Sequence, residues 1–363
     1  MKRYRRMASR VKRTKPRRIG KVQVFGGPWS LIKTTVIGKY MVFFNRALKN
    51  SSFQRVYIDA FAGSGAFRYI TDAPKFTLFG VRDETQDIHA GSAQLTLTVD
   101  PPFHRVFFIE KNRSNVKALK QLISEYDHPA AEVVRRNAND VLQKICRPQK
   151  WRRRRGVIFL DPFGMGVEWK TLELIAQTRA LDVWFLFAIG ALIRNLPASA
   201  SKLDVGKKAA VTRVLGTEEW FNQFYKTPLA PSRTLWGATS PPIVPRRTAK
   251  VNEVEAYIGN RLRTIFRHVE PPKRLRGPKN QSLFSLFFAV SKSEWGRYQS
   301  CASRSFSYPQ QYLIGNSSQV LPSNVRPVRF LFLPPHCLKK NAVPAARQAV
   351  RISSTHQSFI GLA

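Results

Sequence analysis

The chain has 363 residues, with 61 Lys and Arg against 22 Asp and Glu and a formal net charge of +39. Its 43% hydrophobic and 12% aromatic residues can form a sizeable core, which excludes wholesale disorder. The longest apolar run, Val183 to Ile193, is broken by Gly190 and is shorter than the roughly 18 residues of a membrane span. A charge this positive indicates a polyanionic partner, either nucleic acid or an anionic membrane surface; we expect nucleic acid, DNA or RNA.

Cysteine and histidine usage points to neither a disulfide framework nor a metal site. The cysteines are odd in number and widely spaced: Cys146, Cys301 and Cys337. The histidines at positions 104, 128 and 268 have no partners at metal-ligand spacing. We therefore expect no metal and a reducing, cytoplasmic setting.

Residues 1–24 are predicted to be a basic, disordered tail. About every second residue from Met1 to Val22 is Lys or Arg, and no acid precedes Asp59. Such a block repels itself until it meets phosphates, although a merely solubilising tail is the alternative.

Residues 25–225 have the pattern of an α/β core. Apolar residues at helical spacing predict an amphipathic helix over Trp29–Leu48. Short runs rich in β-branched and aromatic residues then predict strands at 56–58, 105–109, 132–134, 156–160 and 181–187. Helices are expected between them, near 91–99, 113–125, 139–145 and 169–177. Buried strands that alternate with helices indicate a mostly parallel, Rossmann-like sheet with flanking helices.

The remainder divides into two parts. Residues 226–298 contain a Pro-rich linker, a predicted helix near 252–268 and a late strand near 283–290, which together complete the fold. Residues 299–363 contain no Asp or Glu and show poor periodicity, and we regard them as a divergent basic extension.

The first strand ends in a candidate cofactor loop. It comprises Asp59, Phe61, Ala62, Gly63, Ser64 and Gly65. A glycine-rich turn after a buried strand allows a cofactor to approach the backbone. Without a third glycine it is a weak dinucleotide fingerprint, and without a following Lys-Ser or Lys-Thr it is not a phosphate-binding loop. Alone, it could equally be an ordinary strand-to-helix turn.

Polar residues also follow the later strands. Glu110 follows the second strand and could accept both hydrogen bonds of a ribose diol. Asn139 and Asp140 follow the third and could border an adenine, and Asp161 follows the fourth. Each acid alone could be a helix cap, Asp140 especially and Glu110 to a lesser degree. All of them in this order favour a ligand site at the carboxyl edge of the sheet.

This order resembles that of Rossmann-like S-adenosylmethionine-dependent methyltransferases and, more narrowly, the three-Cys-motif partner family, over roughly residues 25–290. The motifs that carry the resemblance are Trp29, Lys33, 57–65, Gly91-Ser92, 108–111, 137–140, 160–165, 182–184, Arg194 and 216–220. The resemblance implies a methyltransferase-type fold, S-adenosylmethionine as cofactor and a separate partner protein that carries the three-Cys motif. The spacing from Asp59 to Glu110 is longer than usual, which implies an insertion near Tyr69–Ile88.

The resemblance also implies roles for the site residues. Residues 62–65 would pass under the methionine part of the cofactor, with Asp59 near its amino group, Glu110 at the ribose, and Asn139 with Asp140 at the adenine. Asp161, Pro162 and Phe163 resemble the Asp-Pro-Pro-Tyr motif of enzymes that methylate exocyclic amines of nucleic acids, so we assign them as candidate catalytic residues. The second proline of that motif is missing here, and Asp161 could instead be a cofactor or structural contact.

Other features admit simpler interpretations. The runs Arg152–Arg155 and Lys273–Arg276 suit a solvated or phosphate-facing patch better than a catalytic one, and Trp184 and Trp220 suit the core. The leading hypothesis is a methyltransferase that acts on nucleic acid together with a partner protein. The alternative is a non-catalytic binding protein that keeps the sheet as a scaffold. A nicotinamide-dependent oxidoreductase is disfavoured because the third glycine is absent.

Overall fold

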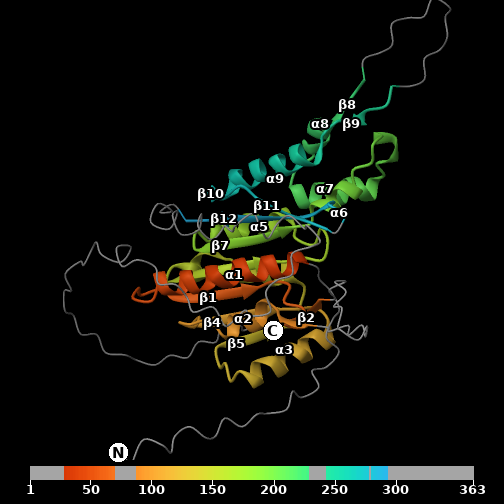
Figure 1. Cartoon of the computed structure of the whole chain (residues 1–363). Helices are drawn as coiled ribbons and strands as arrows, with labels where there is room; N and C mark the ends of the chain where they lie inside the picture. The colour runs from red at the N-terminus through yellow and green to blue at the C-terminus, as the bar shows by residue number, and fades with distance from the viewer. Residues whose placement is uncertain (1–27, 70–86, 229–242, 278, 293–363) are drawn as a thin grey trace, which may run out of the picture. The chain divides into compact units, whose positions relative to one another are not determined.

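The computed structural model describes residues 28–69, 87–228, 243–277 and 279–292 (Figure 1). The predicted basic tail, most of the predicted insertion and the predicted extension at 299–363 lie outside these residues.

A mixed, mostly parallel sheet forms the centre of the fold, as the sequence predicts. Its strands are β1 (Gln54–Asp59), β4 (Arg105–Ile109), β5 (Ala131–Val134), β6 (Arg154–Leu160), β7 (Leu181–Phe187), β10 (His268–Val269), β11 (Lys273–Arg276) and β12 (Ser282–Val290). The order is β10-β12-β7-β6-β1-β4-β5, and β11 also pairs with β12. The five strands from β7 to β5 are mutually parallel.

β12 enters the sheet in the opposite direction and lies against β7, with Phe288 paired to Trp184. It is therefore covered on one edge by β7 and on the other by β10 and β11, which are both antiparallel to it. The late strand predicted near 283–290 is confirmed, and its antiparallel direction is an addition from the structure.

The described helices are α1 (Pro28–Ala47), α2 (Ser92–Leu97), α3 (Arg113–Glu125), α4 (Ala138–Ile145), α5 (Trp169–Gln177), α6 (Ile189–Arg194), α7 (Val205–Leu215), α8 (Trp220–Phe224) and α9 (Val251–Ile265). α1 contacts α2 and α2 contacts α3, whereas α5 contacts α4, α7 and α9. These two groups cover the two faces of the sheet, the arrangement that buries parallel strands on both sides.

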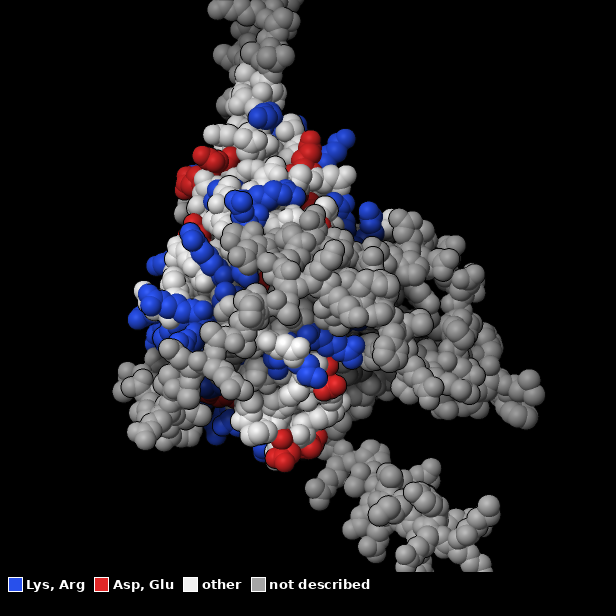
Figure 2. All heavy atoms as spheres, turned by 90° about the vertical axis from the view of Figure 1, so that its left-hand side faces the viewer, with Lys and Arg blue, Asp and Glu red and all other residues white. Residues whose placement is uncertain are grey.

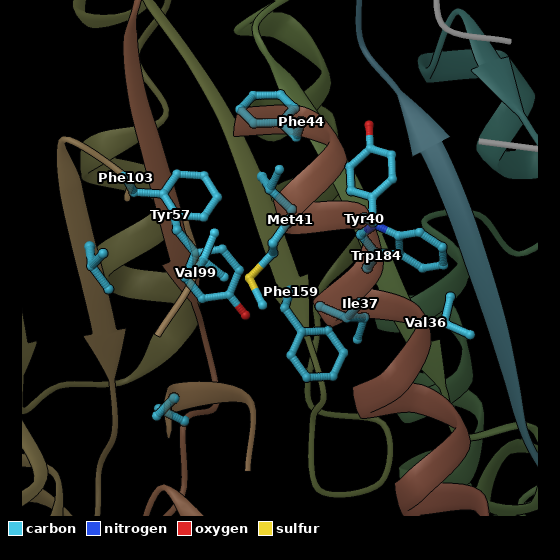
Figure 3. Packing of buried hydrophobic residues seen from close by; sticks show 14 of the residues in the cluster. Val36, Ile37, Tyr40, Met41, Phe44, Tyr57, Val99, Phe103, Phe159 and Trp184 are labelled. Atoms are coloured by element: carbon cyan, nitrogen blue, oxygen red, sulfur yellow. The ribbon is translucent and has the colours of Figure 1, made fainter. Parts of the chain in front are cut away.

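The helix that opens the described chain is the main element of one core layer. Ile37, Tyr40, Met41 and Phe44 recur at helical spacing and are buried against the sheet (Figure 3). The ring centroids of Tyr40 and Trp184 are 5.4 Å apart, in an edge-to-face arrangement. Trp184 is thus a core residue, as expected, and so is Trp220, which has no exposed surface.

The predicted insertion leaves and returns at one point of the fold. β2 (Ala66–Tyr69) and β3 (Asp87–Ala90) pair antiparallel, and α2 begins two residues after β3. A second small sheet pairs β8 (Tyr225–Lys226) with β9 (Arg246–Arg247). Among the described helices, none combines the length and apolarity that a membrane span requires.

Candidate functional site

A cavity of about 700 Å³ lies at the carboxyl ends of β1, β4, β5 and β6. It is lined by the turn after β1, by Lys33 and Thr34 of α1, by Glu110 to Asn112, by Arg136 to Ala138, and by Asp161 to Gly164. Segments far apart in the sequence therefore meet at the edge of the sheet where open α/β folds bind ligands.

The glycine loop forms the floor of this cavity. Ala60 N–H donates to the Phe159 carbonyl at 3.0 Å and Ala62 N–H to the Ile109 carbonyl at 3.1 Å, which ties the loop to both neighbouring strands. All the predicted loop residues from Phe61 to Gly65 line the cavity.

The two glycines of the loop are needed for different reasons. Gly63 has φ +62° and Gly65 has φ +83°, the left-handed region that glycine adopts without steric cost. A Cβ on Gly65 would lie 2.7 Å from Leu122 Cδ2, so this glycine lets α3 approach the loop. A Cβ on Gly63 would meet no atom within 4 Å. Gly63 thus presents bare backbone to open space in the cavity.

Asp59 lies beneath the cavity and does not line it. Its carboxylate is fully buried, accepts a hydrogen bond from Ser92 Oγ at 2.5 Å and accepts another from Phe61 N–H at 3.3 Å. Burial raises the pKa of Asp59 to about 7, and the hydrogen bond from Ser92 opposes that shift. Asp59 therefore holds the loop and Ser92 in place, rather than presenting its carboxylate to a ligand as the sequence suggested.

Glu110 lines the cavity, as predicted. Its Oε1 accepts a hydrogen bond from Asn112 N–H at 2.6 Å, and its Oε2 accepts one from Asn115 Nδ2 at 3.3 Å. The alternative that Glu110 is a helix cap is only partly right: Asn112 is the residue that caps α3, and Glu110 accepts the hydrogen bond of the Asn112 N–H. A carboxylate has about four acceptor positions, so these two bonds orient Glu110 and leave acceptor capacity for a ligand.

The structure does not bring Asn139 or Asp140 into the cavity. Asn139 is 8% exposed and its amide bonds the next loop: Nδ2 donates to the Gly166 carbonyl at 3.0 Å, and Oδ1 accepts from Thr171 Oγ1 at 2.9 Å. Asp140 is exposed in the first turn of α4, whose cap is Asn137. The predicted contact of these two side chains with an adenine is therefore corrected: Asn137 and Ala138 line the cavity instead.

Asp161 lines the cavity and is held by a residue from α1. Lys33 Nζ donates a hydrogen bond to Asp161 Oδ2, and the two side chains are 16% and 24% exposed. Lys33 was among the motif residues of the resemblance but not among the predicted site residues. Only the packing of α1 across the sheet reveals the pair.

Pro162 and Phe163 continue the wall of the cavity. Pro162 is buried, whereas Phe163 is 87% exposed, a large value for an aromatic side chain. Gly164 follows with φ +64°, which lets the chain turn sharply after the ring. The ring is thus carried at the cavity wall on its solvent side, where a planar group could stack on it.

The two predicted charge runs, Arg152–Arg155 and Lys273–Arg276, lie in different structural settings. In the second run, Arg274 is half-buried and paired: Nη1 donates to Asn252 Oδ1 at 2.7 Å and the guanidinium pairs with Glu255. This run forms β11, in which Leu275 is buried and Arg276 is exposed, so the run is partly paired and partly solvated. The described residues contain no cluster of three potential metal ligands.

Comparison with known proteins finds only distant structural likenesses. No family model matches the chain, and no curated protein matches it. Among solved structures, protein LPL1258 from Legionella pneumophila aligns with 77% of this chain and 90% of its own, at 10% identity and a TM-score of 0.40. TYW2 of M. jannaschii, in complex with AdoMet, aligns with 70% of this chain and 73% of its own, at 11% identity and a TM-score of 0.28. An S-adenosylmethionine-dependent methyltransferase from Clostridium acetobutylicum aligns with 71% of this chain and 92% of its own, at 7% identity and a TM-score of 0.29. Because the scores and identities are this low, function has to be inferred from the cavity itself.

Proposed function

We propose that this chain is an S-adenosylmethionine-dependent methyltransferase that acts on nucleic acid. One observation carries the proposal: the same cavity is lined both by the glycine loop with Glu110 and by Asp161, Pro162 and Phe163. Cofactor-type and acceptor-type groups therefore share one space, as a displacement reaction between two bound molecules requires.

The residues present fit the cofactor. The volume of about 700 Å³ lies in the range of ligand pockets. The bare backbone at Gly63 allows close approach, Glu110 offers carboxylate oxygens to a ribose diol, and Asn137 with Ala138 borders the adjoining space. When bound, S-adenosylmethionine would supply an electrophilic methyl group. The chain's own task is then to position the acceptor and keep it oriented.

The opposite part of the cavity suits an acceptor with an exocyclic amine. Lys33 engages Asp161 Oδ2, which leaves Oδ1 of that carboxylate to accept a hydrogen bond from an amine. Phe163 would stack on the base that carries the amine. A base in a duplex would have to be flipped out to reach this point, whereas a single strand could enter directly.

A nucleic-acid acceptor is favoured by the charge at the cavity. Lys111 and Arg136 are exposed and line it, in a chain of net charge +39. Positive side chains at the cavity would attract a polyanionic acceptor to it. The motif residues quoted above further favour membership of the three-Cys-motif partner family, and with it a dedicated partner protein.

The second candidate is a non-catalytic scaffold that binds nucleic acid or a partner. The Lys33–Asp161 ion pair favours the scaffold, because such a pair stabilises the fold whether or not an acceptor ever binds beside it. S-adenosylmethionine binding separates the two candidates.

The test is titration calorimetry with S-adenosylmethionine on protein stripped of nucleic acid at high salt. Binding, followed by transfer of a labelled methyl group to oligonucleotides, would support the enzyme. A folded protein that binds no cofactor would overturn the proposal and leave the scaffold.

A further inference from the structure

We propose a second nucleic-acid contact on the opposite edge of the sheet: a phosphate-binding hollow built around Arg152 and Arg179. The hollow has a volume of about 750 Å³ and is lined by Pro148, Gln149, Arg152, Glu173, Gln177 and Arg179, among others. It does not depend on methyl transfer or on the cofactor.

The hollow lies at the amino ends of the parallel strands. Arg152 precedes β6 and Arg179 precedes β7, whereas the candidate active site follows the carboxyl end of β6. The hollow and the candidate active site lie at opposite ends of β6, whose seven residues span roughly 23 Å at about 3.3 Å per residue. Figure 2 shows the face on the left of Figure 1, where these strands begin, and Lys and Arg side chains gather there in large groups.

The run Arg152–Arg155 divides into two structural and two exposed arginines. Arg154 Nε donates to Gln54 Oε1 at 2.9 Å, and the guanidinium of Arg155 lies 3.9 Å from the ring centroid of Phe53. Arg152 and Arg153 are exposed, and their side chains have no hydrogen bond or ion pair with any part of the chain that the structure describes. Two cations are therefore available to a ligand.

These two arginines project from a fixed turn. Trp151, immediately before them, is 2% exposed, and its Nε1 donates to the Ile145 carbonyl at 2.9 Å. A buried indole with a hydrogen-bonded N–H anchors the backbone from which Arg152 extends. The charge is thus presented by a structured segment, not by a loose tail.

Arg179 is the second independent observation. It follows the last turn of α5 with φ +50°, the position where helices usually place glycine. A non-glycine residue at positive φ is uncommon, and such outliers concentrate at functional positions. An arginine occupies the strained position, its side chain is exposed at the hollow, and among the described residues it has no side-chain partner.

The chemistry of the lining suits a phosphodiester backbone. Guanidinium groups bind phosphate oxygens in a bidentate manner, and the amides of Gln149 and Gln177 add neutral donors. The one acid of the lining, Glu173, accepts a hydrogen bond from Trp169 Nε1 at 2.8 Å. A membrane surface fits less well, because none of the large exposed apolar side chains of the described residues, which would insert into lipid, lines the hollow.

The experiment compares Arg152→Gln/Arg179→Gly with Lys117→Gln/Lys120→Gln in the full chain. Both variants remove two exposed cations, the second pair from α3. Fluorescence anisotropy of a labelled duplex oligonucleotide is measured over a series of salt concentrations. If both arginines contact phosphates, the slope of log K against log salt falls by about 1.8 in the first variant and is little changed in the second.

The choice of glycine at 179 keeps the result interpretable. Glycine adopts positive φ without strain, so the thermal midpoint of Arg179→Gly should equal or exceed that of the wild type. Equal loss of slope in both double variants, or no loss in the first, overturns the proposal. The proposal is also overturned if Arg152→Gln/Arg179→Gly weakens binding to phosphatidylserine vesicles as much as, or more than, it weakens binding to the oligonucleotide. S-adenosylmethionine affinity should be unchanged in both variants, so failure of this site is distinguishable from failure of the proposed enzyme.

Discussion

Lys33 and Asp161 are 128 residues apart in the sequence and are joined by a hydrogen bond from Nζ to Oδ2. One lies in α1 and the other directly follows β6, so the pair fastens the covering helix to the carboxyl edge of the sheet. The ammonium group fixes one carboxylate oxygen and thereby sets the direction of the other. We therefore treat Lys33 as a positioning residue that acts through Asp161.

Lys33→Met should lower methyl transfer by about 10- to 100-fold, because a misdirected Asp161 no longer orients the acceptor. S-adenosylmethionine affinity should change little, and Lys33→Arg should restore part of the rate. Single-turnover transfer and calorimetry measure the two quantities separately. If cofactor affinity and rate fall together in both variants, the pair has a structural role only.

Glu110→Ala should raise the dissociation constant for S-adenosylmethionine by about tenfold or more, since hydrogen bonds to a charged group contribute about 1.5–3 kcal/mol. Asp140→Ala is the matched control, because Asp140 is exposed outside the cavity and should leave that constant unchanged. Calorimetry on both proteins checks the expectation. A larger effect at Asp140 than at Glu110 would restore the original assignment of Asp140 to the cofactor.

The two loop glycines should respond differently to alanine. Gly65→Ala should destabilise the fold by about 2–4 kcal/mol, because backbone strain adds to a clash with Leu122. Gly63→Ala meets open space, so it should cost only about 1–2 kcal/mol of stability while weakening cofactor binding. Urea unfolding and calorimetry on each variant measure the two effects. Unchanged S-adenosylmethionine affinity in Gly63→Ala would show that Gly63 does not contact the cofactor.

Phe163→Ala should leave the thermal midpoint unchanged, because the side chain is 87% exposed. Loss of a stacking contact with a base weakens binding by about 1–3 kcal/mol, so acceptor affinity should fall while cofactor affinity stays constant. Phe163→Trp should preserve acceptor affinity. A destabilised alanine variant with normal acceptor affinity would assign the ring to packing.

Stability should decrease as pH rises toward neutrality because of two acids. Burial raises the pKa of Asp59 to about 7, and burial also raises that of Asp182, which accepts a hydrogen bond from Tyr40 Oη at 2.7 Å, to about 7. Both values exceed the 3.8 of an ordinary aspartate, so between about pH 4 and 7 the folded state binds protons that the unfolded chain has released. The free energy of unfolding therefore falls across this window, by a few kcal/mol for each group, and levels off above it.

Asp59→Asn should flatten this dependence in part, and Asp59→Asn/Asp182→Asn should flatten it further. Chemical unfolding at a series of pH values between about 4 and 8 gives the slopes. A wild-type slope in the double variant would mean that neither carboxyl group titrates in this range.

The sequence was sufficient for the framework of the sheet. Alternating buried strands and amphipathic helices identified α3 and α5 to the residue, and they placed the glycine loop, Glu110 and Asp161 at one edge. These features are local in the chain: each follows from period, composition and the direction of a parallel strand. The cavity that joins them was a consequence of the topology.

The roles that the sequence missed depend on partners distant in the chain. The amide of Asn139 bonds to Thr171 and Gly166, 32 and 27 residues away, and no local pattern reveals that it is already engaged. Likewise, Asp59 was placed at the ligand because the strand-end position is visible in the sequence, whereas its burial beneath Ser92 is not. Burial and pairing across elements are tertiary properties, which a single sequence shows only indirectly.

The position of β12 also sets an order for folding on the ribosome. β7 is complete at residue 187, but its outer edge stays unpaired until the antiparallel strand at 282–290 has been synthesised. At about 5–20 residues per second, roughly 5 to 20 seconds separate the two events. During that interval the apolar segment Leu181–Phe187 presents an open edge, which is the kind of surface on which nascent chains aggregate or recruit chaperones.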